Sequence, residues 1–237
     1  DQQRPRTDQL WKLYTDAIRE HCKIPVVHCL GNHDIWGWNK AKSKTTGTEM
    51  GWGKKNAIDL LGLPNSYYST MLPPRSGASV KLIVLDSVRP LEDRYTSGLD
   101  AEQRTWLEAE LEQTPQATPI VVVSHIPIIS VTPFSFDHNA VTEDYQRVPG
   151  GLMHLDGTSL HQLFKQHGNV KLCLSGHMHL NDRCDVDGIS YICDGAVCGD
   201  WWNGDPRRSD EGYGLIDLYN DGTFEHAYTP FDWKVRA

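Results

Sequence analysis

The chain has 237 residues, of which 39% are hydrophobic and 23% are charged, and its formal net charge is −8 at pH 7. These values are those of an ordinary globular protein rather than a disordered chain. The acidic balance excludes a broad face for the phosphate backbone of nucleic acids, which needs clustered Lys and Arg. No apolar run is long enough to cross a bilayer, so we expect no membrane span.

The first two thirds of the chain predict alternating helices and strands. Apolar spacing and capping residues predict helices at Thr7–His21, Thr48–Leu61, Asp100–Leu111 and Thr158–Gln166. Short apolar runs predict strands at Ile24–Leu30, Tyr67–Leu72, Val80–Leu85, Pro119–Val123 and Val170–Leu174. The run Ile24–Leu30 is almost continuously apolar, as expected of a strand buried on both faces. Ile126–Gly151 is long, irregular and rich in Pro, Ser and Thr, which indicates a functional loop.

The last third of the chain predicts antiparallel hairpins. Asp187-Gly188 separates the apolar runs Cys184–Val186 and Ile189–Ile192, and Asn220–Gly222 separates Leu215–Tyr219 from Phe224–Tyr228. We therefore expect one α/β domain over residues 1–237, with a mixed sheet covered by helices.

The six cysteines are too sparse for a disulfide scaffold. Cys29, Cys173 and Cys193 lie in apolar runs and are expected to be buried free thiols. Cys193 and Cys198 are close enough to pair in an oxidising compartment, so the sequence leaves the redox environment open.

Side chains of the kinds that bind metals follow the first of these strands. Asn32 and His33 come after Gly31, at the carboxyl edge where open α/β sheets bind ligands. The amide oxygen of Asn32 is an acceptable ligand for Mn, Mg or Zn. His33 can donate a proton to a leaving group, and Asp34 can hold its tautomer and raise its pKa. A polar turn without chemistry is the alternative for this motif taken alone.

Two further strand ends add imidazoles. His125 follows the run Pro119–Val123, although a hydrogen-bonded core histidine is the simpler interpretation of this residue alone. His177 and His179 are two positions apart, which in an extended chain places both on one side. Nitrogen ligands suit Zn, Fe, Mn or Ni. The three strand ends together predict a metal centre at one edge of the sheet.

These motifs resemble a known family. Gly31–Asp34, the lone His125 and Gly176–His179 occur in the order of the later motifs of the calcineurin-like metallophosphoesterase superfamily, and the chain resembles that family over residues 7–230. The resemblance implies an α/β sandwich of mixed sheets flanked by helices, with two metal ions (Mn, Fe or Zn) at the strand ends. It also implies a small phosphorylated substrate and hydrolysis by a metal-bound hydroxide.

The resemblance assigns roles to the motif residues. Asn32, His125 and His177 would hold one ion, and His179 would help to hold the other. His33, positioned with Asp34, would act on the phosphate and the leaving group. The Gly-Asn-His-Asp motif resembles the branch of cyclic-nucleotide and glycerophosphodiester phosphodiesterases.

The chain departs from the family in its acidic motifs. Asp-x-His and Gly-Asp-x-x-Asp normally precede the Asn-His motif and supply the bridging carboxylate, and neither lies upstream of Asn32. We therefore expect a truncated domain that lacks its first strands, with an incomplete dinuclear centre and only partial metal occupancy. The alternative is a degenerate, non-catalytic domain that binds a phosphorylated ligand or partner.

Three residues have weaker claims to contact the substrate. His138 lies in the long loop and can line the mouth of the site, Arg183 can meet a phosphate oxygen, and Trp202 can stack on a base or sugar. A solvated loop, a surface ion pair and simple packing are the respective alternatives. The oligomeric state and the compartment stay open.

Overall fold

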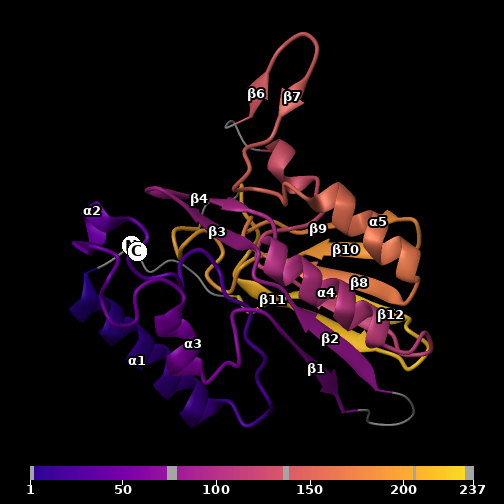
Figure 1. The fold of residues 1–237 in the computed structure, drawn as a ribbon, viewed down its shortest axis with the longest axis horizontal. Helices are drawn as coiled ribbons and strands as arrows, with labels where there is room; N and C mark the ends of the chain where they lie inside the picture. Colours follow the sequence, from indigo (N-terminus) through magenta and orange to yellow (C-terminus); the bar gives the residue numbers. More distant parts are fainter. Residues whose placement is uncertain (1–2, 74–78, 136–138, 205–206, 233–237) are drawn as a thin grey trace.

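The computed structural model describes residues 3–73, 79–135, 139–204 and 207–232. A six-stranded mixed sheet forms its centre, and its strands are β1 (Tyr68–Leu72), β2 (Val80–Val84), β5 (Ile120–Val123), β8 (Val170–Ser175), β9 (Asp182–Val186) and β10 (Ile189–Cys193). The strand order is β1-β2-β5-β8-β10-β9 (Figure 1). Strands β2, β5, β8 and β10 are parallel, whereas β1 and β9 pair antiparallel at the two edges.

Each face of this sheet packs against a different layer. Helices α4 (Ala101–Gln113) and α5 (Gly157–His167) cover one face, where Leu107 and Phe164 pack with Ile83 of β2. The hairpin of β11 (Gly212–Leu218) and β12 (Phe224–Pro230) covers part of the other face, where Ile216 packs with Leu82. Neighbouring residues of β2 thus serve opposite layers, as the two-residue period of a strand dictates. The α/β fold of a mixed sheet flanked by helices is confirmed.

The predicted elements are largely present, with a few differences. The expected helix at Thr48–Leu61 is only α3 (Lys55–Leu61), because Gly51 and Gly53 have left-handed φ values of 79° and 73°. Two hairpins were not predicted, namely β3 (Val88–Leu91) with β4 (Arg94–Ser97), and β6 (Ala140–Val141) with β7 (Gln146–Arg147). The second projects from the body in Figure 1. The other short elements are α2 (Lys40–Ser43) and a 3-10 turn at Thr132–Ser135.

The predicted buried strand at Ile24–Leu30 is wrong. This segment is in no strand of the described chain, and Ile24 is 75% exposed. Its backbone instead hydrogen-bonds with a side chain. The Tyr68 hydroxyl donates to the carbonyl of His28 at 2.7 Å. An apolar run becomes a buried strand only where a neighbouring strand completes its hydrogen bonds, and none of the described strands pairs with this segment.

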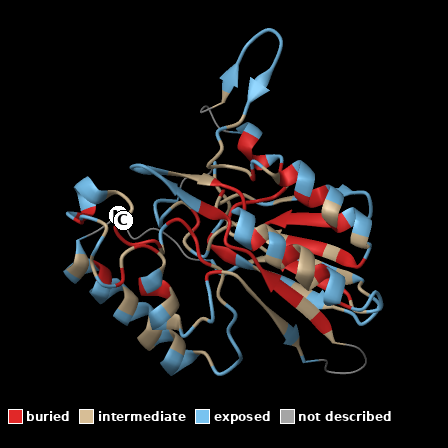
Figure 2. Cartoon of the chain, viewed as in Figure 1, coloured by how far each residue is buried: buried red, intermediate tan, exposed pale blue. Residues whose placement is uncertain are grey.

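The segments before β1 lie at one flank of the sheet. Buried residues gather in the central strands and in the loops at their ends, whereas helix α1 (Arg4–His21) is largely intermediate or exposed (Figure 2). Thr7 is the buried residue of α1. Within the described ranges, no helix is both long and apolar enough to cross a membrane.

A buried ion pair ties this flank to the sheet. Lys54, at the start of α3, reaches Asp86 just after β2 and also donates to the carbonyl of Val88, both at 2.5 Å. Removing one partner of such a pair leaves a buried charge alone. We expect Lys54→Met to lower the free energy of unfolding by about 3 kcal/mol.

Lys55→Met is the matched control, because the ion pair of Lys55 with Asp59 is exposed. An exposed pair of this kind contributes about 0.3–0.5 kcal/mol. Urea denaturation of the two variants measures the difference. Equal losses of stability in both variants would contradict the role given to Lys54.

Candidate metal centre

Three ligand-type atoms meet beyond the carboxyl ends of β5 and β8. The Nε2 atom of His125 lies 2.8 Å from Oδ1 of Asn32 and 3.0 Å from Nδ1 of His177. Asn32 follows Ile24–Leu30, which pairs with no described strand, whereas His125 follows β5 and His177 follows β8. The convergence expected of these three side chains is present in the structure.

Hydrogen bonds fix which atoms of the imidazoles carry lone pairs. Nε2 of His177 donates to the carbonyl of Gly151 at 2.8 Å, so Nδ1 of the same ring is left with its lone pair. That lone pair and the amide oxygen of Asn32 both face Nε2 of His125. A metal ion that replaced the proton between them would meet three donor atoms.

His177 and His179 are not part of an extended chain, so the prediction that both side chains lie on one side of it is wrong. Both residues have left-handed backbone, with φ values of 70° and 55°. Nδ1 of His179 donates to the carbonyl of Gly199 at 2.5 Å, and its ring packs beside Trp201. The two rings therefore have different hydrogen-bond partners, although His179 lines the same cavity as Asn32, His125 and His177.

Gly31 is required at the site for close approach. A Cβ atom at this position would lie 2.8 Å from the His125 ring. Real Cβ atoms essentially never come so near to another heavy atom, so a side chain at Gly31 would push the His125 ring out of place.

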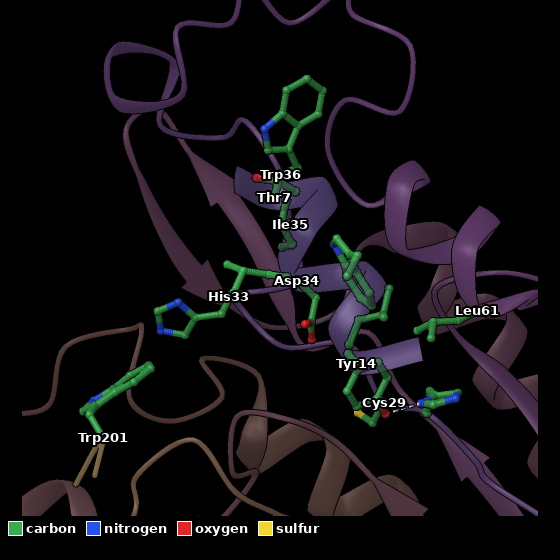
Figure 3. Close-up of a pocket in the computed structure, with 13 residues that line it drawn as sticks. Thr7, Tyr14, Cys29, His33, Asp34, Ile35, Trp36, Leu61 and Trp201 are labelled. Carbon is green, nitrogen blue, oxygen red and sulfur yellow. Dashed lines mark hydrogen bonds between the residues drawn. The ribbon is translucent and has the colours of Figure 1, made fainter. Parts of the chain in front are cut away.

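His33 lies at the edge of this group, and its predicted contact with Asp34 is not formed. The carboxylate of Asp34 turns back to accept from the Gly31 amide at 2.7 Å. The His33 ring points the other way, toward Trp201, with ring centroids 4.9 Å apart (Figure 3). The pKa of His33 is lowered by desolvation rather than raised by a carboxylate.

Burial keeps the central imidazoles neutral at pH 7. Desolvation lowers the pKa of His125 to about 3, with His177 as a further cause. Desolvation also lowers the pKa of His177 to about 4, against the opposing effect of the Gly151 carbonyl. Neutral imidazoles are the form that binds metal ions.

A cavity of about 220 Å³ opens over these residues, and its charge is positive. Its lining includes Arg208, which donates to the carbonyl of Met178 at 3.0 Å, and contains no Asp or Glu. Tyr95 and Trp201 add aromatic walls. A cavity of this charge favours an anionic group.

The weaker candidates lie elsewhere. Arg183 pairs with Asp185 at 3.0 Å and stacks over Phe224, while the Trp202 ring packs near Phe231, and neither lines the cavity. His138 lies outside the described residues. Sequence reasoning considered the pair Trp201-Trp202 for stacking and chose Trp202, whereas Trp201 lines the cavity. It missed Arg208, for which the sequence offers no signal beyond the nearby charges.

Comparison with known families gives the class of this fold. Residues 4–181 match the family described as calcineurin-like phosphoesterase, and the chain belongs to that family. Members of the family generally use a dinuclear metal centre. No curated protein matches the sequence.

Solved structures resemble the chain at low identity. GAP50, the anchor in the inner membrane complex of Plasmodium, is 19% identical, with a TM-score of 0.47 over 73% of this chain and 53% of its own length. The chain thus spans about half of that protein. A dimetal phosphatase from Danio rerio is 16% identical, with a TM-score of 0.47 over 80% of this chain and 68% of its own.

The phosphopantetheinyl hydrolase of Mycobacterium tuberculosis is 14% identical to this chain. Its TM-score is 0.52, over 85% of this chain and 79% of its own length. This similarity supports a shared fold.

The spacing of the three donor atoms fits that of neutral ligands around one metal ion. Two ligands at right angles on an ion about 2.1 Å away lie about 3 Å apart, which is the spacing of Asn32 Oδ1, His125 Nε2 and His177 Nδ1. The fit is incomplete, because no three His, Cys, Asp or Glu side chains of the described residues converge on one point. A bridging acid is missing from this part of the chain.

Replacing a ligand should weaken metal binding. We expect His125→Ala to lower the Zn²⁺ affinity by at least the roughly 10–100-fold that loss of a ligand's hydrogen-bond partner costs. Isothermal titration calorimetry measures the affinity. The control is His21→Ala, since His21 lies exposed at the end of α1; equal affinities of the two variants would contradict the assignment.

Proposed function

We propose that this chain carries the neutral ligands of the metal centre of a phosphoester hydrolase. We propose further that the substrate is a small phosphodiester. The observation that carries the proposal is the convergence of Asn32 Oδ1, His125 Nε2 and His177 Nδ1 beside His33. Family membership supports the reaction class. The preference for a diester is supported by the likeness of the Gly-Asn-His-Asp motif to the phosphodiesterase branch.

The proposed ligands have distinct tasks. Asn32, His125 and His177 would hold one ion, and His179, through the nitrogen left free by its bond to Gly199, would contribute to a second. Mn, Fe or Zn suits these nitrogen and oxygen donors. Metal ions in such centres lower the pKa of water and stabilise the attacking and leaving oxygens.

The remaining residues would act on the substrate directly. Arg208, which pairs with Asp200 at 3.8 Å, lines the cavity and would hold the phosphate group through its guanidinium. His33 lines the same cavity, from which its imidazole can hydrogen-bond the leaving oxygen and give it a proton. Asp34 contributes by holding the turn through Gly31, which places Asn32 and His33.

A second candidate is a non-catalytic domain that binds a phosphorylated ligand. The observation in its favour is that no acid is among the described residues that line the cavity. Such a domain would bind phosphate analogues through Arg208 and the imidazoles without turnover.

Loss of His33 should separate chemistry from metal binding. We expect His33→Ala to lower kcat for methyl phenyl phosphate, whose phenoxide is a poor leaving group, by roughly 10²–10⁴-fold, because the leaving oxygen loses its proton donor. The bound metal, counted by mass spectrometry after Mn²⁺ loading, should stay at the level of the unmodified chain.

His125→Ala gives the opposite pattern, with metal and activity lost together. A chain that binds metal and a phosphonate analogue but hydrolyses no ester would favour the non-catalytic domain. Full activity of His33→Ala would refute the role given to this imidazole.

A further inference from the structure

A second and larger cavity lies beside the candidate centre. Its volume is about 680 Å³, and its lining is mainly apolar. It runs between helix α1 and the segment from His28 to Trp36 (Figure 3). The apolar walls are Leu10, Trp11, Tyr14, Trp36, Leu61 and Trp201. A volume of this size is typical of sites for organic ligands.

The two cavities share two lining residues, which we call the threshold between them. His33 and Trp201 line both of them. The Trp201 ring lies between two site histidines, 4.9 Å from His33 and 5.2 Å from His179, measured between ring centroids. If the phosphate of a substrate occupied the smaller cavity, any part of the substrate that extended into the larger cavity would contact Trp201.

The backbone at this threshold is strained. Trp201 and Trp202 both have left-handed φ values, 54° and 66°, which are uncommon for bulky residues. A tight turn holds them, in which the Trp202 amide donates to the carbonyl of Cys198 at 2.8 Å. Trp201 is nonetheless 54% exposed. Strain that holds a large exposed aromatic ring at a cavity mouth is typical of a binding residue.

Two polar contacts in the larger cavity are made within its own lining. The Tyr14 hydroxyl lies 3.2 Å from Nδ1 of His28, and Asp34 accepts from the Gly31 amide. Asp34 is an acid and the lining has no Lys or Arg, so the charge of this cavity disfavours a second phosphate. The walls favour an apolar group.

We infer that the larger cavity binds the organic part of the substrate, and that the substrate is a phosphoester of an apolar alcohol with a long alkyl chain. This inference rests on the proposed function for the position of the phosphate. Trp201 is then a specificity-determining residue, which the organic group contacts as it passes from one cavity to the other.

A series of alkylphosphonates from methyl to octyl tests the inference without turnover. Calorimetry on the Mn²⁺-loaded chain, below the concentration at which octylphosphonate forms micelles, measures each affinity. We expect the affinity to rise roughly three- to fourfold for each methylene that is buried. A flat series, or no binding at any length, would overturn the inference.

Two variants of α1 form a matched pair for this series. Leu10 lines the cavity, whereas Leu13 is 69% exposed on the same helix and does not line it. Leu10→Asp should flatten the dependence on chain length, whereas Leu13→Asp should keep the dependence. Equal slopes in the two variants would overturn the inference.

Variants of Trp201 test the threshold. Trp201→Ala should weaken octylphosphonate at least tenfold more than methylphosphonate, and Trp201→Phe should restore most of the difference. An equal loss for both phosphonates would contradict a role in specificity.

The failure of this inference can be told from that of the proposed function. If affinity rises along the phosphonate series but no ester is hydrolysed, alkyl binding in the larger cavity is supported and the hydrolase proposal is refuted. If esters are hydrolysed but the series is flat, the hydrolase proposal is supported and alkyl binding is refuted.

Discussion

Strands β5 and β8 end level with each other, and the candidate centre depends on this pairing. Val123 is the register partner of Leu174, so the loops that carry His125 and His177 leave the sheet side by side. The Gly176 amide then donates to the carbonyl of His125 at 3.1 Å, which extends the pairing beyond the strands. The imidazole nitrogens lie 3.0 Å apart because the backbones that carry them are bonded to each other.

A second constraint comes from the loops that surround this pair. The Gly151 carbonyl fixes the tautomer of His177, and the stretch that contains Gly151 is held by β4, where the Ser97 hydroxyl donates to the carbonyl of Met153 at 2.6 Å. On the other side, Gly31 leaves room for the His125 ring. The orientation of the donor atoms thus depends on residues far from them in the sequence, as is usual for metal ligands.

Much of the fold could be predicted from local patterns. Strands β5 and β8 are short apolar runs, and the Asp187-Gly188 turn specifies the hairpin of β9 and β10. Ile24–Leu30 has a similar composition, yet it pairs with no described strand. An apolar run indicates that a segment can form a buried strand, but whether it does depends on a partner that the run itself does not contain.

The site could be predicted in its residue types and less so in its geometry. The ends of β5 and β8 identified His125 and His177, because their positions follow from the sheet. Asn32 was assigned to a third strand end, but the segment before it forms no described strand. The directions of the side chains depend on backbone conformation and tertiary contacts, which is why the left-handed His177 and the turned-away Asp34 were not foreseen. The same holds for Trp201, which the turn at residues 198–203 directs to the site in place of Trp202.

The most direct test of this account is X-ray absorption spectroscopy of the Zn²⁺-loaded chain. The account predicts a shell of nitrogen and oxygen at about 2.0–2.1 Å with the scattering of two imidazoles. Sulfur ligands are not expected, because burial raises the pKa of the Cys29 and Cys193 thiols to about 12. A shell with sulfur at about 2.3 Å, or one without imidazole scattering, would contradict the assignment of Asn32, His125 and His177.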